Sequence, residues 1–275
     1  MRRRFLPTLS APRLDLSGLP LVLLGGLVFC YLAAPLIGLV LNLSGTDLVR
    51  TWGDPQTRAA VTTSVITATI ATLIVGALGV PLAYLLARFR FPGRTIINVL
   101  VFLPLVLPPV SAGILLLILY GPYGTIGQLL SPHGVELVDA ASGIVLAQVF
   151  VSAPFVIVAA RSAFEQIDAE YEEAAASMGA SVWQVFWHVA LPMARGGIIA
   201  GLTLGWMRAL GEFGATVILA YHPYSLPVLN WVNLSGTGLS TALPLALLAL
   251  LIAGAVLLTL LLLEQVDWGT RLSRP

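Results

Sequence analysis

The chain has 275 residues, of which 58% are hydrophobic and only 10% are charged, with a formal net charge of +1. A water-soluble domain carries about 25% charged residues, so this composition excludes one and predicts a membrane protein; the small net charge gives no basis for nucleic-acid binding. The single cysteine, Cys30, excludes disulfides, zinc clusters and iron–sulfur centres built by this chain alone, and its three histidines show no metal-ligand spacing.

Six apolar segments are long enough to cross a bilayer as helices, which takes about 20 residues. They cover residues 19–41, 61–87, 95–120, 142–164, 196–221 and 242–263. The predicted fold class is all-α, a polytopic membrane protein with one six-helix transmembrane domain at 19–263. Tails at 1–18 and 264–275 flank this domain, and a polar loop at about 165–195 joins the fourth and fifth helices.

Arginines predict the orientation, because cytoplasmic loops retain positive charge. With the N-terminus inside, eleven of the 14 arginines fall in cytoplasmic segments, two (Arg50 and Arg58) fall outside and Arg208 lies in a span. Both tails and the 165–195 loop are therefore predicted to be cytoplasmic. The first apolar segment exceeds the roughly 7–15 residues of a cleaved signal peptide, so we expect it to remain as a span.

Three prolines interrupt the third predicted span: Pro104, Pro108 and Pro109. Each proline removes a backbone donor and clashes with the preceding turn, so the helix is predicted to bend or break. Broken backbone at membrane depth is tolerated where protein or a water-filled cavity covers it. Two interpretations stay open: a gate or lining of a transport pathway, and a packing kink.

The 165–195 loop predicts two short helices. Asp168 can cap the first helix, and Gly179 is suited to end it in the left-handed region. Ser181 and Gln184 have the spacing of a capping box that opens the second helix. We expect that helix to end before Pro192, because the residue ahead of a proline avoids helical geometry.

Each short helix has one apolar face. These faces carry Tyr171, Ala174, Ala175 and Met178 in the first helix, and Val182, Val185, Phe186 and Val189 in the second. Such a small hairpin is marginal in water and needs a surface to pack against. Docking on a protein partner is favoured over an interfacial helix pair on lipid headgroups, because the first helix carries acidic residues and no base.

A charged pair, Arg208 and Glu212, lies within the fifth predicted span at a spacing that allows pairing on one helix face. Three interpretations stay open. In the first, the pair neutralises itself between packed helices; in the second, it lies beside the route of an anion; in the third, Glu212 relays protons. The flanking glycines at 211 and 214 allow close approach of another helix.

No lysine occurs anywhere in the chain. A phosphate-binding Walker loop requires a lysine after its glycines, so this chain cannot carry an ordinary one. Any ATP hydrolysis must therefore come from a partner subunit. A secondary ion-coupled carrier would need buried carboxylates on several spans and repeated halves, and the sequence shows neither. A membrane enzyme would need clustered titratable residues near one depth, and only Arg208 and Glu212 qualify.

The polar loop resembles the coupling loop of ATP-binding-cassette (ABC) importer permeases. The matching positions are Glu173, Ala174, Ala175, Gly179, Leu191 and Pro192, while Val189 stands where the family pattern has Ile. The resemblance implies a two-fold dimer of permeases in a prokaryotic inner membrane, two cytoplasmic ATPases and an external solute-binding protein. It also implies that this chain binds no cofactor, whereas the ATPases use ATP and Mg.

Two further runs narrow the resemblance. Residues 208–216 (Arg-Ala-Leu-Gly-Glu-Phe-Gly-Ala-Thr) and 103–109 look like the permeases for oxyanions, the molybdate, tungstate and sulfate group. Residues 220–223 are closer to the molybdate/tungstate branch. The implied function is an import pathway for molybdate or tungstate, with a sulfate/thiosulfate permease of the same group as the alternative. An ion-coupled secondary transporter is the rival of another class.

Overall fold

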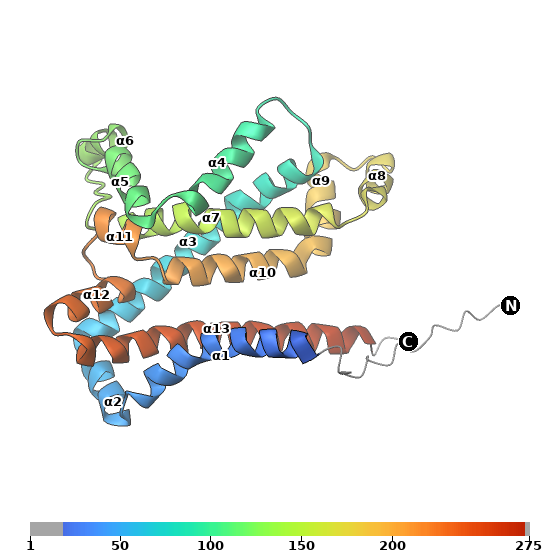
Figure 1. The fold of residues 1–275 in the computed structure, drawn as a ribbon. Coiled ribbons are helices and arrows are strands. Elements are labelled where there is room, and N and C mark those ends of the chain that lie inside the picture. Colours follow the sequence, from blue (N-terminus) through green and yellow to red (C-terminus); the bar gives the residue numbers. More distant parts are fainter. Residues whose placement is uncertain (1–18, 273–275) are drawn as a thin grey trace. The chain divides into compact units, whose positions relative to one another are not determined.

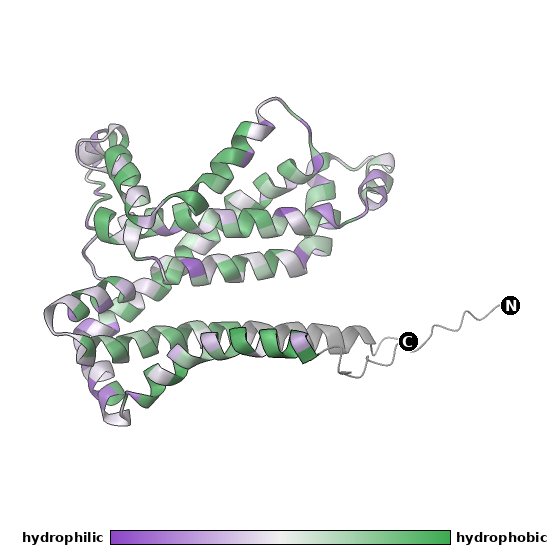
Figure 2. Ribbon diagram, viewed as in Figure 1, coloured by the Kyte–Doolittle hydropathy of each residue, from purple (hydrophilic) through white to green (hydrophobic). Residues whose placement is uncertain are grey.

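The computed structural model describes the backbone of residues 19–272 and the side chains of residues 19–259. This part of the chain is helical and contains no strand. Six segments are long and apolar enough to cross a membrane, which confirms the predicted number of spans (Figure 2). They are Leu19–Leu41, Pro55–Arg88, Pro109–His133, Ala141–Glu165, Val182–Leu210 and Leu239–Thr259. The predicted tail at 1–18 and the last three residues of the predicted tail at 264–275 lie outside the described residues.

The chain divides into two compact units, residues 1–47 and 48–275. The first unit contains α1 (Leu19–Leu41), an apolar helix that buries none of its side chains. It also contains the start of α2 (Gly45–Gly53), where Ser44 and Asp47 cap each other: Ser44 N–H donates to Asp47 Oδ2 at 3.0 Å, and Asp47 N–H donates to Ser44 Oγ at 3.3 Å. This reciprocal capping fixes the start of α2, which begins four residues after α1 ends.

The centre of the second unit is a packed group of three long helices, α3 (Pro55–Arg88), α7 (Ala141–Glu165) and α10 (Leu191–Leu210) (Figure 1). α10 approaches α7 closely because it presents glycine at every fourth position. A Cβ added at Gly197 would lie 2.5 Å from Ala163 Cβ, and one at Gly205 would lie 2.5 Å from Val156 Cγ2. Small residues at such interfaces let helix backbones approach within a bilayer, where burial of apolar surface alone does not drive association.

The third predicted span is broken, as its prolines predict. α4 (Arg94–Val106) ends at Leu107 and α5 (Pro109–Tyr120) begins immediately after Pro108. Leu107 and Pro108 are extended, with ψ of 132° and 136°, whereas Pro104 remains inside α4. The break therefore depends on the Pro108–Pro109 pair. The segment that can span continues from α5 through α6 (Thr125–Leu130) and the 3-10 turn η2 (Ser131–His133).

The prediction that the second loop helix ends before Pro192 is wrong. α9 (Val182–Val185) continues through a π-helical stretch, η3 (Phe186–Ala190), directly into α10. Leu191 N–H bonds to the Phe186 carbonyl five residues back. This wider turn lets the helix continue past Pro192, which lacks a backbone donor and would clash in an ordinary α-helical turn.

The fifth predicted span, 196–221, is also not continuous. α10 begins earlier, at Leu191, and ends at Leu210; a non-helical stretch at 211–213 separates it from α11 (Gly214–Leu219). The expected outer loop that follows contains a further helix, α12 (Leu226–Gly236), which is too short to register as a span. The last helix, α13 (Leu239–Leu272), extends past residue 263, where the sequence prediction ended it.

Candidate coupling segment and translocation gate

The polar loop folds into α8 (Ala169–Ser177), followed by a tight turn and α9. The Asp168 side chain accepts from Glu170 N–H at 3.2 Å, which confirms the predicted cap. At the other end Gly179 has φ +89°, its N–H bonds to the Ala176 carbonyl, and Ala180 N–H bonds to the Ala175 carbonyl. These two bonds form a Schellman motif, so the role of Gly179 is conformational.

The second helix starts at the predicted capping box. Ser181 N–H donates to Gln184 Oε1 at 2.8 Å, and Gln184 N–H donates to Ser181 Oγ at 3.3 Å. Because α9 continues through η3 into α10, the turn after α8 is connected to a membrane-spanning helix without a flexible joint.

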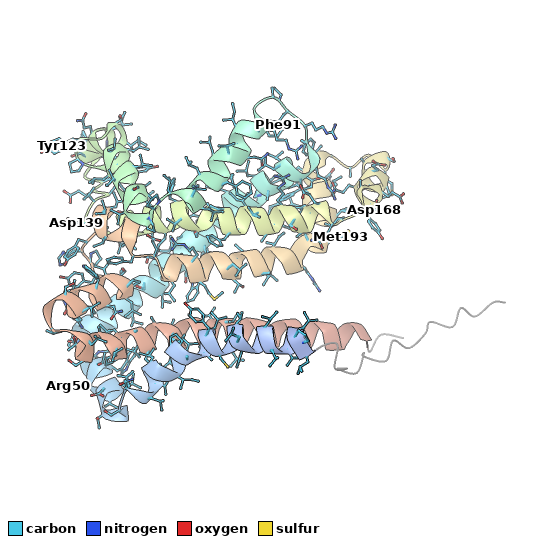
Figure 3. The ribbon with its side chains drawn as sticks, viewed as in Figure 1. Arg50, Phe91, Tyr123, Asp139, Asp168 and Met193 are labelled. Carbon is cyan, nitrogen blue, oxygen red and sulfur yellow. The ribbon has the colours of Figure 1, made fainter. Side chains whose placement is uncertain are left out.

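α8 and the start of α10 lie at one end of the α7–α10 pair. Figure 3 places Asp168 and Met193 at this end and Tyr123 and Asp139 at the opposite end. A groove of about 480 Å³ opens here, and its walls combine acidic and apolar side chains from α8 and η3. The lining residues are Asp168, Glu170, Tyr171, Ala174, Ala175, Met178 and Val189.

The structure brings part of the predicted coupling set together. Ala174 and Ala175 meet Val189 in this groove, and all four residues of the predicted apolar face of the first helix line it. Glu173 is exposed on α8. Leu191 and Pro192 lie in the first turn of α10 rather than in the groove.

The hairpin is anchored by an aromatic cluster. Phe186 is buried, with 3% of its surface exposed, and its ring centroid lies 5.1 Å from that of Tyr84 on α3 and 6.2 Å from that of Phe164 on α7. Trp183 stacks on the same ring at 5.7 Å. The second predicted apolar face is therefore used within the chain, except that Val182 remains exposed.

Sequence reasoning missed an ion pair that holds α8. Arg88, at the end of α3, contacts Glu172 Oε1 through Nε and Nη2, both at 2.8 Å, and Tyr84 Oη donates to Glu172 Oε2 at 2.8 Å. The residues are 84 and 88 positions apart in the chain. Two features of the sequence could have indicated this pair: the first loop helix carries several carboxylates and no base, and the second predicted span is followed by Arg88.

The two broken helices meet at their breaks. Gly214, the first residue of α11, faces Pro109, the first residue of α5; an added Cβ would lie 2.5 Å from Pro109 Cβ. One helical turn on, a Cβ at Gly113 would lie 2.8 Å from Ile218 Cβ and 2.9 Å from the Ala215 carbonyl oxygen. The backbones of α5 and α11 are therefore in close contact, which brings Pro109, one of the candidate gate prolines, against the segment that follows Glu212.

Arg208 and Glu212 pair across the break in the fifth span, as their spacing predicts. Glu212 is 1% exposed; one carboxylate oxygen contacts Arg208 and the other accepts from Ala215 N–H at 2.7 Å. The carboxylate thus neutralises the arginine and caps the start of α11. Gln148 on α7 supports the other side of the break, since its Nε2 donates to the Ala209 carbonyl at 3.0 Å.

This geometry favours the self-neutralising interpretation over a proton relay. Within residues 19–259, Glu212 is the one buried carboxylate, so a proton leaving it meets no second buried acid. The Arg208 side chain is 29% exposed, which leaves part of the guanidinium accessible beside the break. Among the side chains that the structure describes, residues 19–259, no group of His, Cys, Asp and Glu could hold a metal ion.

Comparison with known proteins extends over most of the chain. The family described as binding-protein-dependent transport system inner membrane component matches residues 79–271. A probable molybdenum ABC transporter permease protein of Haloferax volcanii is 48% identical over 86% of this chain and 87% of its own. The molybdate/tungstate transport system permease protein WtpB of Thermococcus kodakarensis is 37% identical over 82% and 87%. The sulfate transport system permease protein CysT of Synechocystis sp. is 33% identical over 87% and 86%.

Solved structures share the fold at low identity. A chain of the bacterial alginate ABC transporter, crystallised with an alginate pentasaccharide-bound periplasmic protein, has a TM-score of 0.71 and 19% identity, with 88% of this chain and 92% of that chain covered. A chain of the inward-facing MetNI methionine ABC transporter has a TM-score of 0.59 and 16% identity, with 75% and 94% covered. Since the family model matches residues 79–271 and the sequence relatives match over most of their own length and of this chain, the chain belongs to the binding-protein-dependent transport system inner membrane components. These are the permease subunits of ABC importers, which transport and are not enzymes.

Proposed function

We propose that this permease forms the translocation pathway of an importer for molybdate or tungstate. The observation that carries the proposal is the 48% identity with a permease named for molybdenum over 86% of this chain, supported by the 37% identical molybdate/tungstate permease. A sulfate permease is the second candidate, because the sulfate relative is 33% identical over a comparable span.

The partner that binds in the groove beside α8 is a separate ATPase, present in two copies. The ATPase binds and hydrolyses ATP with Mg, whereas this chain binds no cofactor. The groove supports this through its chemistry. Asp168 and Glu170 give it negative charge, while Tyr171 and Met178, which is 84% exposed, offer apolar contact. We expect the ATPase to insert an apolar side chain flanked by basic residues, since charge-complementary surfaces steer association and set register.

The pathway gate lies where α5 meets α11. The backbone breaks at 107–108 and 211–213 give two hinges, and the close contact of α5 with α11 lets these short helices move as a pair. Arg208 sits at the second hinge with its charge balanced by Glu212. A balanced arginine attracts a passing dianion without holding it, which transport requires.

The assembly is a dimer of two copies of this chain, joined on the outer face by a solute-binding protein that delivers the anion. Both termini and α8 face the cytoplasm of a prokaryotic cell, where α8 meets the ATPase. The excess of arginines in these segments supports that orientation, as does the position of Tyr123 and Asp139 at the far end from Asp168 (Figure 3).

Reconstitution tests the proposal directly. The permease, its ATPase and its solute-binding protein are placed in lipid vesicles with ATP, and uptake of molybdate, tungstate and sulfate is measured singly and in competition. Accumulation of molybdate or tungstate that excess sulfate does not suppress supports the proposal. Equal competition by sulfate favours the second candidate, and uptake without the ATPase contradicts the importer mechanism.

A further inference from the structure

α8 is tied to a helix that is distant in sequence by a compact polar cluster, which we call the Glu172 tether. It consists of Glu172 on α8 and Arg88 and Tyr84 on α3. The Glu172 and Arg88 side chains are 12% and 17% exposed, so the pair is largely shielded from water. Both carboxylate oxygens have a partner: Oε1 accepts from Arg88, and Oε2 accepts from the Tyr84 hydroxyl.

Arg88 extends the cluster to a third element. Its Nη2 also donates to the Ile167 carbonyl at 2.9 Å, in the turn between α7 and α8. One guanidinium therefore joins the end of α3, the end of α7 and the side of α8. Planar guanidinium groups suit this role, because their donors diverge in a rigid fork that fixes the orientation of several acceptors at once.

α8 itself makes few other contacts with the bundle, because the aromatic cluster around Phe186 anchors η3 and not α8. It has nine residues, and Ala175 is its one buried side chain. A helix this short is marginal by itself, and a single methyl group offers little resistance to sliding. The covalent connections lead into α7 on one side and through α9 and η3 into α10 on the other, but neither leads to α3.

We propose that Glu172 is a positioning residue that locks α8 to α3, so that the force of the ATPase on α8 reaches the packed group of α3, α7 and α10 without tilting α8. The inference rests on the proposed function, because it concerns how the coupling segment drives the spans. Without the tether, α8 tilts about its connections to α7 and α9, and part of the displacement that the ATPase gives to α8 does not reach the spans. ATP is then hydrolysed with less transport, while the ATPase still binds.

Substitution within the tether measures this coupling. Glu172→Gln keeps the shape and removes the charge, and we expect the transport per ATP hydrolysed to fall roughly tenfold, the size of one lost charged hydrogen bond. Tyr84→Phe removes only the bond to Oε2, and we expect a smaller loss of roughly threefold. In the exchanged pair Arg88→Glu with Glu172→Arg, transport per ATP recovers in part, since the ion pair returns but the bond to Ile167 does not.

A matched control uses an ion pair of similar length whose two members lie in one helix; the bond of Arg161 to Asn98 on α4 does not involve Glu165. Arg161 and Glu165 lie in one helix with Nε–Oε1 at 2.8 Å, and the Glu165 side chain is 44% exposed. Glu165→Gln is expected to leave transport per ATP unchanged. A loss equal to that of Glu172→Gln would overturn the proposal, because any nearby charge would then have the same effect.

A distance measurement separates the tether from the proposed function. With Cys30→Ala as background, spin labels are attached at Ser177→Cys on α8 and Arg90→Cys beyond α3, both exposed. In the permease–ATPase complex we expect one narrow distance distribution, which broadens on Glu172→Gln. An unchanged distance distribution in Glu172→Gln overturns the tether, whatever the transport measurement gives. If the wild-type protein does not transport an oxyanion, the proposed function is wrong, but the distance result still decides whether the tether exists.

Discussion

Gly179 shows how one backbone angle can determine the shape of the candidate coupling segment. An added Cβ there meets nothing within 4 Å, yet φ is +89°, which L side chains rarely adopt. The constraint at this position is therefore conformational and not steric.

We predict that uptake falls in the order Gly179, Gly179→Asn, Gly179→Val. A residue forced into the left-handed region costs about 1–2 kcal/mol, and asparagine tolerates that region better than a β-branched residue does. Membrane insertion should be unaffected, because the turn lies outside the spans. Transport and ATPase co-purification are measured, with Gly254→Ala in α13 as control, where an added Cβ also meets nothing. Normal uptake by Gly179→Val would contradict the assigned role of the turn.

The Arg208–Glu212 pair makes an asymmetric prediction. Arg208→Leu leaves a carboxylate that is 1% exposed without its counterion, which costs about 3–5 kcal/mol, whereas Glu212→Gln leaves an arginine that is 29% exposed. We therefore expect Arg208→Leu to lower the thermal stability of the detergent-purified protein more than Glu212→Gln does. The double variant should be more stable than Arg208→Leu alone. Equal losses in the two single variants would mean that the pair does not neutralise itself.

Two interrupted helices of this protein meet at their interruptions. The α4–α5 break and the α10–α11 break pack together through Gly214 and Pro109, so irregular backbone is covered by protein, as a lipid environment demands. The π-helical turn at η3 does not interrupt its helix. It allows the helix to continue past Pro192, so that α9 and α10 form one continuous helical segment.

The contact between α5 and α11 predicts a contrast between two neighbouring glycines. Gly214→Ala pushes a methyl group to 2.5 Å from Pro109 Cβ, an overpacking that costs about 1–3 kcal/mol and separates α5 from α11. Gly211→Ala meets only the Met207 carbonyl at 3.6 Å and should be tolerated. Uptake in vesicles distinguishes them: we expect a large loss for the first and near-normal transport for the second. Similar activity of both variants would exclude close α5–α11 packing from the transport cycle.

The second unit has a directional arrangement, with α8 at one end of the α7–α10 pair and the turns at Tyr123 and Asp139 at the other (Figure 3). The arginine distribution predicts which end is cytoplasmic.

Cysteine labelling tests this orientation. Since Cys30 is the single native cysteine, Cys30→Ala provides a clean background for Ser177→Cys on α8 and Ser235→Cys on α12. An impermeant thiol reagent added to intact cells should label the second position and not the first. The reverse pattern would place α8 outside, where it could not meet an ATPase.

Local chemistry along the chain already specifies most of this protein. Apolar length predicts six spans, the absence of lysine assigns ATP hydrolysis elsewhere, and Asp168, Gly179 and the Ser181–Gln184 box predict the coupling hairpin because caps depend on residues within four positions of one another. The contacts that join distant segments needed the folded chain. Neither the pairing of Glu172 with Arg88, nor the meeting of Gly214 with Pro109, nor the continuation of the helix past Pro192 follows from local pattern. Each arises from packing between elements, and packing can override the local preference of a residue while leaving no periodic trace in the sequence.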